Sequence, residues 1–335
     1  MAEVNRQFLL AARPQGMVKE SDFQYHEAPV PEPDDGQVLI RTRYISLDPS
    51  MRGQMENRAD YVAPLEIGDV MRAGAVGEVV RSRHPGIAEG TLVTGALGMQ
   101  DYALSDGRQP PLRRFPADVD PTQALGVLGN TGMTAYFGLL ELGRPRFGDT
   151  MVVSGAAGAT GSIAGQIARI HGCRVIGIAG SAEKCRWLTD ELRFDAAIDY
   201  RSDDVGAALD THCPDGIDIY FDNVGGDILD LCLERIATSA RVVVCGGISR
   251  YNATGPLPGP KNYFNLVFRR ARMEGFIVLD YAPRFDEATR QMRAWIEAGR
   301  LTQQATVVDG FAELPRALIR LFEGFNTGKL MVRND

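Results

Sequence analysis

The pattern of hydrophobic and polar positions changes near residue 120. Before it, short apolar runs are separated by proline and glycine, and the segment 37–44 alternates between the two kinds of residue. This alternation, with further short runs at 74–80 and 91–96, is typical of β-strands. After Pro121, apolar runs alternate with stretches of helical periodicity until about residue 300. A mostly β domain is therefore predicted to precede a domain of alternating strands and helices.

Six candidate strands follow one another in the second region. They are predicted at 150–154, 174–179, 197–199, 217–222, 241–245 and 273–279. Strands that alternate with helices indicate a parallel, doubly wound sheet, and six strands match a dinucleotide-binding fold. After residue 300, a strand at 305–311, a helix at 315–322 and a strand at 329–333 are predicted. The expected fold class is α/β, with a Rossmann sheet and a mostly β domain.

The segment 151–170 joins a strand, a glycine turn and a helix in that order. Gly155, Gly158 and Gly161 follow the apolar run at three-residue intervals, and apolar residues at helical spacing come next. Glycines let the backbone approach a pyrophosphate, and the N–H groups at the start of a helix hold its charge. The alternative is a plain strand-to-helix turn, but the flanking elements favour a dinucleotide site.

The end of the next strand indicates which dinucleotide binds. NAD-binding folds usually carry an acidic residue about 20 residues past the glycines, for the ribose hydroxyls. This chain has Gly180, Ser181 and Lys184 there instead. A carboxylate repels a 2′-phosphate, whereas a hydroxyl and a lysine hold it, so NADPH/NADP+ is the predicted cofactor. The alternative is that Lys184 is a solvated charge on a helix face.

Composition and charge exclude several classes of protein. The 335 residues are 44% hydrophobic and 24% charged, which predicts a globular chain of about two domains. The net charge is −7 and like charges do not cluster, so no nucleic acid or membrane partner is expected. Five cysteines without a paired spacing favour reduced thiols, and no secretory signal is recognised. A cytoplasmic protein with a small-molecule substrate is expected.

Metal ligands are scarce in the first half of the chain. No cysteine precedes Cys173, and His26 and His84 are not paired with another ligand at metal spacing. A catalytic zinc needs three protein ligands, so no metal site is predicted. Without a metal, the substrate must itself be polarised to accept a hydride. An α,β-unsaturated ketone or aldehyde qualifies, because hydride at its β-carbon gives an enolate whose charge rests on oxygen.

Several longer motifs resemble one enzyme family. SGAAGATGS, GSAEKCR, FDNVGG, CGGISRYNATGPLPGP and FNTGK occur in this order, and YISLDPSMRG and LGVLGNTGMTAY lie upstream. They resemble the zinc-independent medium-chain dehydrogenases/reductases, in the branch of the prostaglandin reductases, alkenal double-bond reductases and bacterial NADPH-dependent curcumin reductases. The resemblance implies a GroES-like domain at 1–120, completed by 301–335, and a Rossmann domain at 121–300.

The resemblance also implies roles for individual residues, with NADPH bound between the two domains. Gly158, Ala159 and Thr160 would hold the pyrophosphate, while Ser181, Lys184 and Tyr200 would surround the 2′-phosphate. Other residues implied to approach the cofactor are Asn223, Cys245, Gly246, Tyr251, Phe276, Ile277, Val278 and Asn326. Zinc-dependent relatives have Gly-His-Glu where this chain has Val76, Gly77 and Glu78.

Two tyrosines are candidate catalytic residues. Tyr251 follows a predicted strand at the edge of the sheet where ligands bind. Its phenol would donate to the nicotinamide ribose or to the enolate oxygen, and the alternative is a tyrosine that packs the loop. Tyr44, in YISLDPSMRG, is a second candidate donor or a packing residue of its strand.

The predicted function is NADPH-dependent reduction of the C=C bond of α,β-unsaturated ketones and aldehydes. The alternatives are a quinone oxidoreductase of the same superfamily and a non-catalytic NADPH-binding protein. The apolar strand at 273–279, last in the Rossmann order, is expected at a sheet edge that needs a partner. Family members commonly pair there, so a homodimer is expected.

Overall fold

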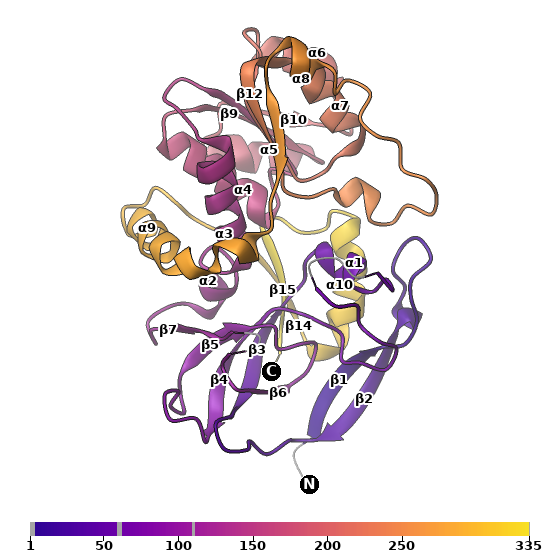
Figure 1. Cartoon of the computed structure of the whole chain (residues 1–335), viewed down its shortest axis with the longest axis vertical. Coiled ribbons are helices and arrows are strands. Elements are labelled where there is room, and N and C mark those ends of the chain that lie inside the picture. The colour runs from indigo at the N-terminus through magenta and orange to yellow at the C-terminus, as the bar shows by residue number, and fades with distance from the viewer. Residues whose placement is uncertain (1–3, 59–61, 109–110, 335) are drawn as a thin grey trace. The chain divides into compact units, whose positions relative to one another are not determined.

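The computed structural model describes residues 4–58, 62–108 and 111–334. Its chain forms two compact units, Met1–Gly129 with Ala305–Asp335 and Asn130–Gln304 (Figure 1). Helix α2 (Pro121–Leu125) packs against β3 (Val38–Ser46) and β4 (Ala75–Ser82) of the first unit. The domain limits predicted from the sequence, 120/121 and 300/301, stay predictions.

The described strands of the first unit form a two-stranded and a seven-stranded sheet. The larger sheet has the order β14-β15-β3-β4-β5-β7, with β6 also paired to β3. Only β14 and β15 pair in parallel among these described strands. Besides β3 and β4, the strands are β1 (Val4–Leu10), β2 (Phe23–Pro29), β5 (Leu92–Gly95), β6 (Tyr102–Ser105), β7 (Arg113–Phe115), β14 (Ala305–Asp309) and β15 (Lys329–Arg333). The predicted strands at 37–44, 74–80, 91–96 and 329–333 are confirmed to within three residues at either end.

Short helices connect these strands and cover their core. Besides α2, they are η1 (Glu20–Asp22), α1 (Ser50–Gln54), η6 (Phe311–Glu313) and α10 (Leu314–Phe322). Apolar residues of β3 and α10, such as Ile40 and Leu318, meet in one buried cluster. The buried ammonium of Lys329, at the start of β15, donates to Asp48 Oδ1 at 2.7 Å and to the carbonyl of Leu47 at 3.0 Å. The last strand is therefore held to the end of β3 by charge as well as by the sheet.

The second unit is a parallel sheet with helices between its strands. Its order is β10-β9-β8-β11-β12-β13, which is the order of a dinucleotide-binding fold and confirms the predicted α/β class. The strands are β8 (Thr150–Ser154), β9 (Arg174–Ala179), β10 (Ala196–Asp199), β11 (Ile217–Asp222), β12 (Ile236–Val244) and β13 (Arg272–Gly275). The helices are α3 (Asn130–Phe137), η2 (Gly138–Gly143), α4 (Ala159–Ile170), α5 (Ala182–Arg186), η3 (Trp187–Glu191), α6 (Val205–His212), α7 (Gly226–Glu234), η4 (Ile248–Arg250), α8 (Asn265–Phe268), η5 (Val278–Arg284) and α9 (Phe285–Glu297).

The predicted strand at 273–279 was wrong in its second half. β13 ends at Gly275, which pairs with Val244, the last residue of β12, so no neighbouring strand continues the ladder. The short helix η5 begins at Val278, and the ring of Phe276 packs against Gly138. The apolar run therefore combines a short edge strand with the start of a short helix, in which Val278 is buried and Leu279 is exposed.

The described part of the chain has no helix that is both long and apolar enough to cross a membrane.

Candidate functional site

The glycine turn joins β8 to α4 at the carboxyl edge of the parallel sheet. Gly155 has a φ of +59°, and a Cβ on Gly161 would lie 2.4 Å from the carbonyl oxygen of Gly155, so both positions require glycine. Gly158 caps α4 with extended backbone. The N–H groups of Ala159, Thr160 and Gly161 belong to the first helical turn, where a helix offers no carbonyl partner. This arrangement fits a bound pyrophosphate.

Ser181, Lys184 and Tyr200 gather beyond the ends of β9 and β10. The hydroxyl of Ser181 accepts the N–H of Lys184 at 3.2 Å and caps α5. The Tyr200 ring covers Gly180, where a Cβ would lie 2.8 Å from the phenol oxygen. Burial, followed by the charge of Arg201, lowers the pKa of the Lys184 ammonium. Two cations and two hydroxyl-bearing side chains therefore share one place, which fits a phosphate dianion.

Arg201 is a member of this group that the sequence analysis missed. Its guanidinium carbon lies 5.9 Å from the centroid of the Tyr200 ring, and the side chain is exposed. The available signal was its position directly after Tyr200, at the end of a predicted strand. That signal alone does not tell whether the side chain faces the site.

Asn223 and Cys245 follow the ends of β11 and β12, next to the glycine turn. The side-chain N–H of Asn223 donates to the carbonyl of Ser154 at 2.7 Å, which ties it to the end of β8. The N–H groups of Cys245 and Gly246 donate to the carbonyl of Asp222 at 2.9 and 3.0 Å. Burial, with a smaller contribution from the charge of Asp222, raises the pKa of the Cys245 thiol to about 12. This thiol is neutral near pH 7 and is no nucleophile there.

Tyr251 comes directly after the short helix η4. Its phenol oxygen accepts the N–H of Gly247 at 3.2 Å, and a Cβ on Gly246 would lie 3.3 Å from that oxygen. The glycines thus let the phenol approach the backbone that follows β12. An accepted hydrogen bond polarises the O–H group and strengthens it as a donor.

Phe276, Ile277 and Val278 follow the edge strand β13. A Cβ on Gly138 would lie 2.5 Å from the Phe276 ring, so this side chain is fixed by packing on η2. Its ring centroid is 6.4 Å from that of Tyr281, with the rings edge to face. Val278 is buried, and the three residues stand at the same carboxyl edge as the glycine turn.

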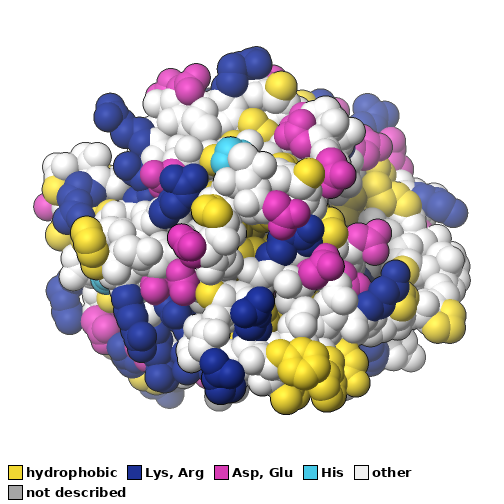
Figure 2. Space-filling model, turned by 90° about the horizontal axis from the view of Figure 1, so that it is seen from above, with side chains coloured by type: hydrophobic (Ala, Val, Ile, Leu, Met, Phe, Trp, Pro, Cys, Tyr) yellow, Lys and Arg dark blue, Asp and Glu magenta, His cyan; other side chains and the backbone are white. Residues whose placement is uncertain are grey.

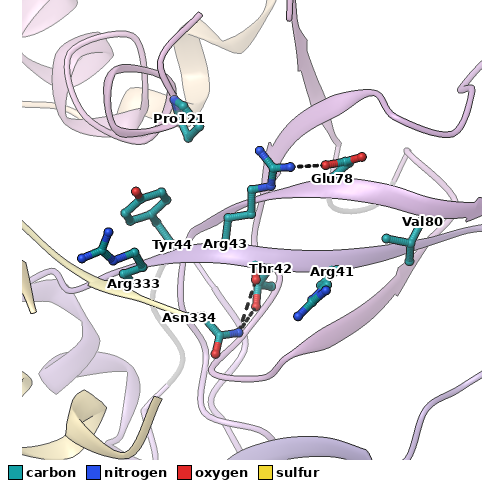
Figure 3. A pocket seen from close by; sticks show the side chains of 9 residues that line it. All are labelled: Arg41, Thr42, Arg43, Tyr44, Glu78, Val80, Pro121, Arg333 and Asn334. Carbon is teal, nitrogen blue, oxygen red and sulfur yellow. Dashed lines mark hydrogen bonds and ion pairs between the residues drawn. The ribbon is translucent and has the colours of Figure 1, made fainter. Parts of the chain in front are cut away.

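The remaining two predicted residues, Tyr44 and Asn326, belong to the first unit. Tyr44 lines a polar hollow of about 610 Å³, together with Arg43 and Arg333 (Figure 3). Asn326 is buried, and its side-chain N–H donates to the carbonyl of Gly328 at 2.7 Å. Tyr44 thus shares this hollow with two arginines, and its catalytic role stays a prediction.

The segment that carries a metal ligand in zinc-dependent relatives has other contacts here. A Cβ on Gly77 would lie 2.4 Å from the carbonyl oxygen of Arg41, and Glu78 forms an ion pair with Arg43. Within the described ranges, no three His, Cys, Asp or Glu side chains form a group that could hold a metal ion. These residues do not fit a three-ligand zinc site.

The sheet order, the glycine turn and the cations beyond β9 define the second unit as a dinucleotide-binding domain. Residues 6–111 match a family described as the N-terminal domain of oxidoreductase, and residues 159–297 match zinc-binding dehydrogenase. The chain belongs to the medium-chain dehydrogenase/reductase superfamily, as its motifs predict, and is an oxidoreductase.

Two curated relatives and one solved structure span nearly the whole chain. The NADPH-dependent curcumin reductase of Escherichia coli (strain K12) is 43% identical over 98% of this chain and 96% of that protein. The 2-alkenal reductase (NADP(+)-dependent) of Nicotiana tabacum is 38% identical over 98% of this chain and 97% of that protein. The crystal structure of CurA from Vibrio vulnificus in complex with NADPH has a TM-score of 0.93 and 42% identity, over 98% of this chain and 99% of that chain.

Proposed function

We propose that this protein uses NADPH to reduce the C=C bond of α,β-unsaturated ketones and aldehydes. The cation pair Lys184 and Arg201 beside Tyr200 is the observation that carries the choice of cofactor, because it suits a 2′-phosphate. The names of the curcumin and 2-alkenal reductases support the choice of substrate class.

The residues of the second unit would hold NADPH at two charged groups. The first-turn N–H groups of α4 would bind the pyrophosphate. Ser181, Lys184 and Tyr200 would bind the 2′-phosphate, with Arg201 adding a second positive charge. When bound, NADPH supplies the hydride.

Reduction then needs little acid–base chemistry from the protein. The substrate's β-carbon accepts the hydride, and the π electrons move to the carbonyl oxygen. The enolate then takes a proton at its α-carbon, from solvent or from a tyrosine. The Tyr251 hydroxyl, polarised by the N–H of Gly247, would donate a hydrogen bond to the enolate oxygen or hold the nicotinamide ribose. No metal takes part in this scheme.

A substrate panel followed at 340 nm tests the proposal. Alkenals, aryl enones, dienones of the curcumin type and 1,4-quinones are each offered with NADPH, before and after prolonged chelation. We expect oxidation of NADPH with the enones and enals, saturated carbonyl products, and equal rates after chelation. Turnover of quinones alone would identify a quinone oxidoreductase, and NADPH binding without turnover would identify a binding protein. Loss of stoichiometric zinc together with activity would refute the metal-free scheme.

The proposal includes a homodimer formed through the exposed edge of β13. Arg272, Met273 and Glu274 of this strand are exposed. The neighbouring segment carries four aromatic or branched side chains that are each more than half exposed, namely Tyr263, Phe264, Val267 and Phe268. Figure 2, seen from the end where α6, α7 and α8 lie, shows hydrophobic side chains gathered in one patch among interspersed charges of both signs. An edge strand next to apolar surface is a frequent pairing site.

A cytoplasmic location is also part of the proposal. It is supported by the five cysteines, which are all free thiols in the structure.

A further inference from the structure

A buried carboxylate stands at the end of β11, behind the candidate cofactor site. Asp222 exposes 1% of its surface. Its Oδ1 accepts four hydrogen bonds, from the hydroxyls of Ser154 (3.0 Å) and Tyr220 (2.8 Å) and from the N–H groups of Val224 (3.0 Å) and Gly225 (2.9 Å). Its Oδ2 is buried and has no hydrogen-bond partner among the described residues. Burying a carboxylate costs free energy unless hydrogen bonds compensate its charge, and here the four donors to Oδ1 supply that compensation. Such a group of donors around one side chain indicates that the carboxylate has a structural role.

Through Ser154, Asp222 spans the point where the strand order reverses. β8 and β11 are neighbours there, and ligands bind at such switch points. The Ser154 hydroxyl donates to Asp222 and accepts the N–H of Asn223 at 3.0 Å. A Cβ on Gly155 would lie 3.4 Å from the Cβ of Asn223, so Asn223 lies beside the glycine turn.

Asp222 also fixes the backbone of the turn that follows it. Gly225 has a φ of +73°, and its N–H and that of Val224 close a tight turn onto the Asp222 carboxylate. The carbonyl of Asp222 holds the N–H groups of Cys245 and Gly246 after β12. Three segments at the carboxyl edge of the sheet therefore converge on one side chain and its own backbone.

We propose that Asp222 is a positioning residue, which sets Asn223 and the turn at 224–225 for the cofactor without touching the substrate. Ser154 and Tyr220, both fully buried, are its supports. The inference rests on the proposed function only in naming NADPH as the group that the turn receives.

The experiment compares Asp222→Ala with Asp218→Ala as the matched control. Asp218 lies on the same strand, and its Oδ2 accepts the N–H of Thr150 at 2.9 Å. It therefore links β11 to β8 near the start of both strands, whereas Asp222 and Ser154 link them at the carboxyl ends. Hydrogen exchange of the Val224 and Gly225 amides is measured without cofactor, and NADPH affinity by calorimetry. We expect Asp222→Ala to raise both the exchange rates and the Kd at least about tenfold, in line with loss of a buried acceptor. Asp218→Ala should lower Tm but keep the exchange rates and the NADPH Kd within about twofold of those of the unsubstituted protein.

Three further variants keep the result decisive. Asp222→Asn retains an acceptor at Oδ1 and should restore most of the amide protection. If Asp222→Ala fails to fold, Ser154→Ala and Tyr220→Phe each remove one donor and should loosen the same two amides. Unchanged amide exchange in Asp222→Ala, or in both Ser154→Ala and Tyr220→Phe, overturns the inference. The unsubstituted protein could fail to bind NADPH while Asp222→Ala still speeds amide exchange. That result would refute the proposed function and leave Asp222 as the residue that sets the turn.

Discussion

At the scale of single residues, the proposed preference for NADPH rests on two neighbouring cations, Lys184 and Arg201. Burial and the charge of Arg201 both disfavour the ammonium form of Lys184, which is why its pKa is lowered. A phosphate dianion between them would relieve that repulsion and accept charge-assisted hydrogen bonds. NADH brings no such group, so the site should hold it less firmly.

Lys184→Ala should raise the KM for NADPH about tenfold to a hundredfold and change that for NADH little, because one charge-assisted contact contributes ~1.5 to 3 kcal/mol. Arg201→Gln should have a smaller effect in the same direction, since its side chain is exposed. The matched control is Arg186→Ala, which removes an exposed positive charge from the same helix. Initial rates with both cofactors measure this, and equal use of NADPH and NADH by the unsubstituted protein would contradict it.

Tyr251→Phe removes the hydroxyl that accepts the N–H of Gly247 and keeps the ring. If the phenol serves the enolate oxygen, kcat should fall by about tenfold or more, the effect of losing one positioned donor, while NADPH affinity changes less. Steady-state rates with deuterated NADPH show whether hydride transfer limits turnover. An unchanged kcat under a full isotope effect removes Tyr251 from the catalytic residues.

At the scale of elements, β13 shows how an edge differs from the centre of a sheet. The central strands β8, β9 and β11 have the bounds that their apolar runs predict, because both faces of a parallel sheet are buried. β13 has a neighbour on one side only, and its ladder ends where β12 ends. Of the apolar residues that follow, Phe276 packs on η2 and Val278 is buried, so hydrophobicity alone does not mark the end of the strand.

The open edge leads to a prediction about assembly. Light scattering at micromolar concentration should give a mass twice that of the chain. Phe268→Glu should yield monomers, since residue 268 is 65% exposed beside the edge and the new charge would be buried on pairing. Phe147→Glu places the same charge at a residue that is 92% exposed in the loop before β8, and should stay dimeric. A monomeric unsubstituted protein, or a dimer that survives Phe268→Glu, speaks against pairing at β13.

At the scale of the whole molecule, the sequence predicts what depends on neighbours along the chain. The glycine turn is a local pattern, and so is the pair Ser181 and Lys184. The residues of each pattern are close in the sequence, and they also lie together in the structure. Asp222 and Arg201 escaped notice because their importance depends on which strands lie side by side. In the sequence, the aspartate of FDNVGG resembles an ordinary turn residue. Only the structure shows that it accepts a hydrogen bond from Ser154, 68 positions earlier.

The first unit is built from both ends of the chain, which affects the order in which the protein can fold as it is synthesised. β15 pairs with β3, and Lys329 reaches Asp48 across 281 residues of sequence. Residues 130–304 leave the ribosome before β14, α10 and β15 exist, so the Rossmann unit can fold first, whereas the earlier β strands must wait with part of their core uncovered. Pairing across such a separation is also slow. The part of the chain that is made first is therefore completed last, and in the meantime it depends most on protection from aggregation.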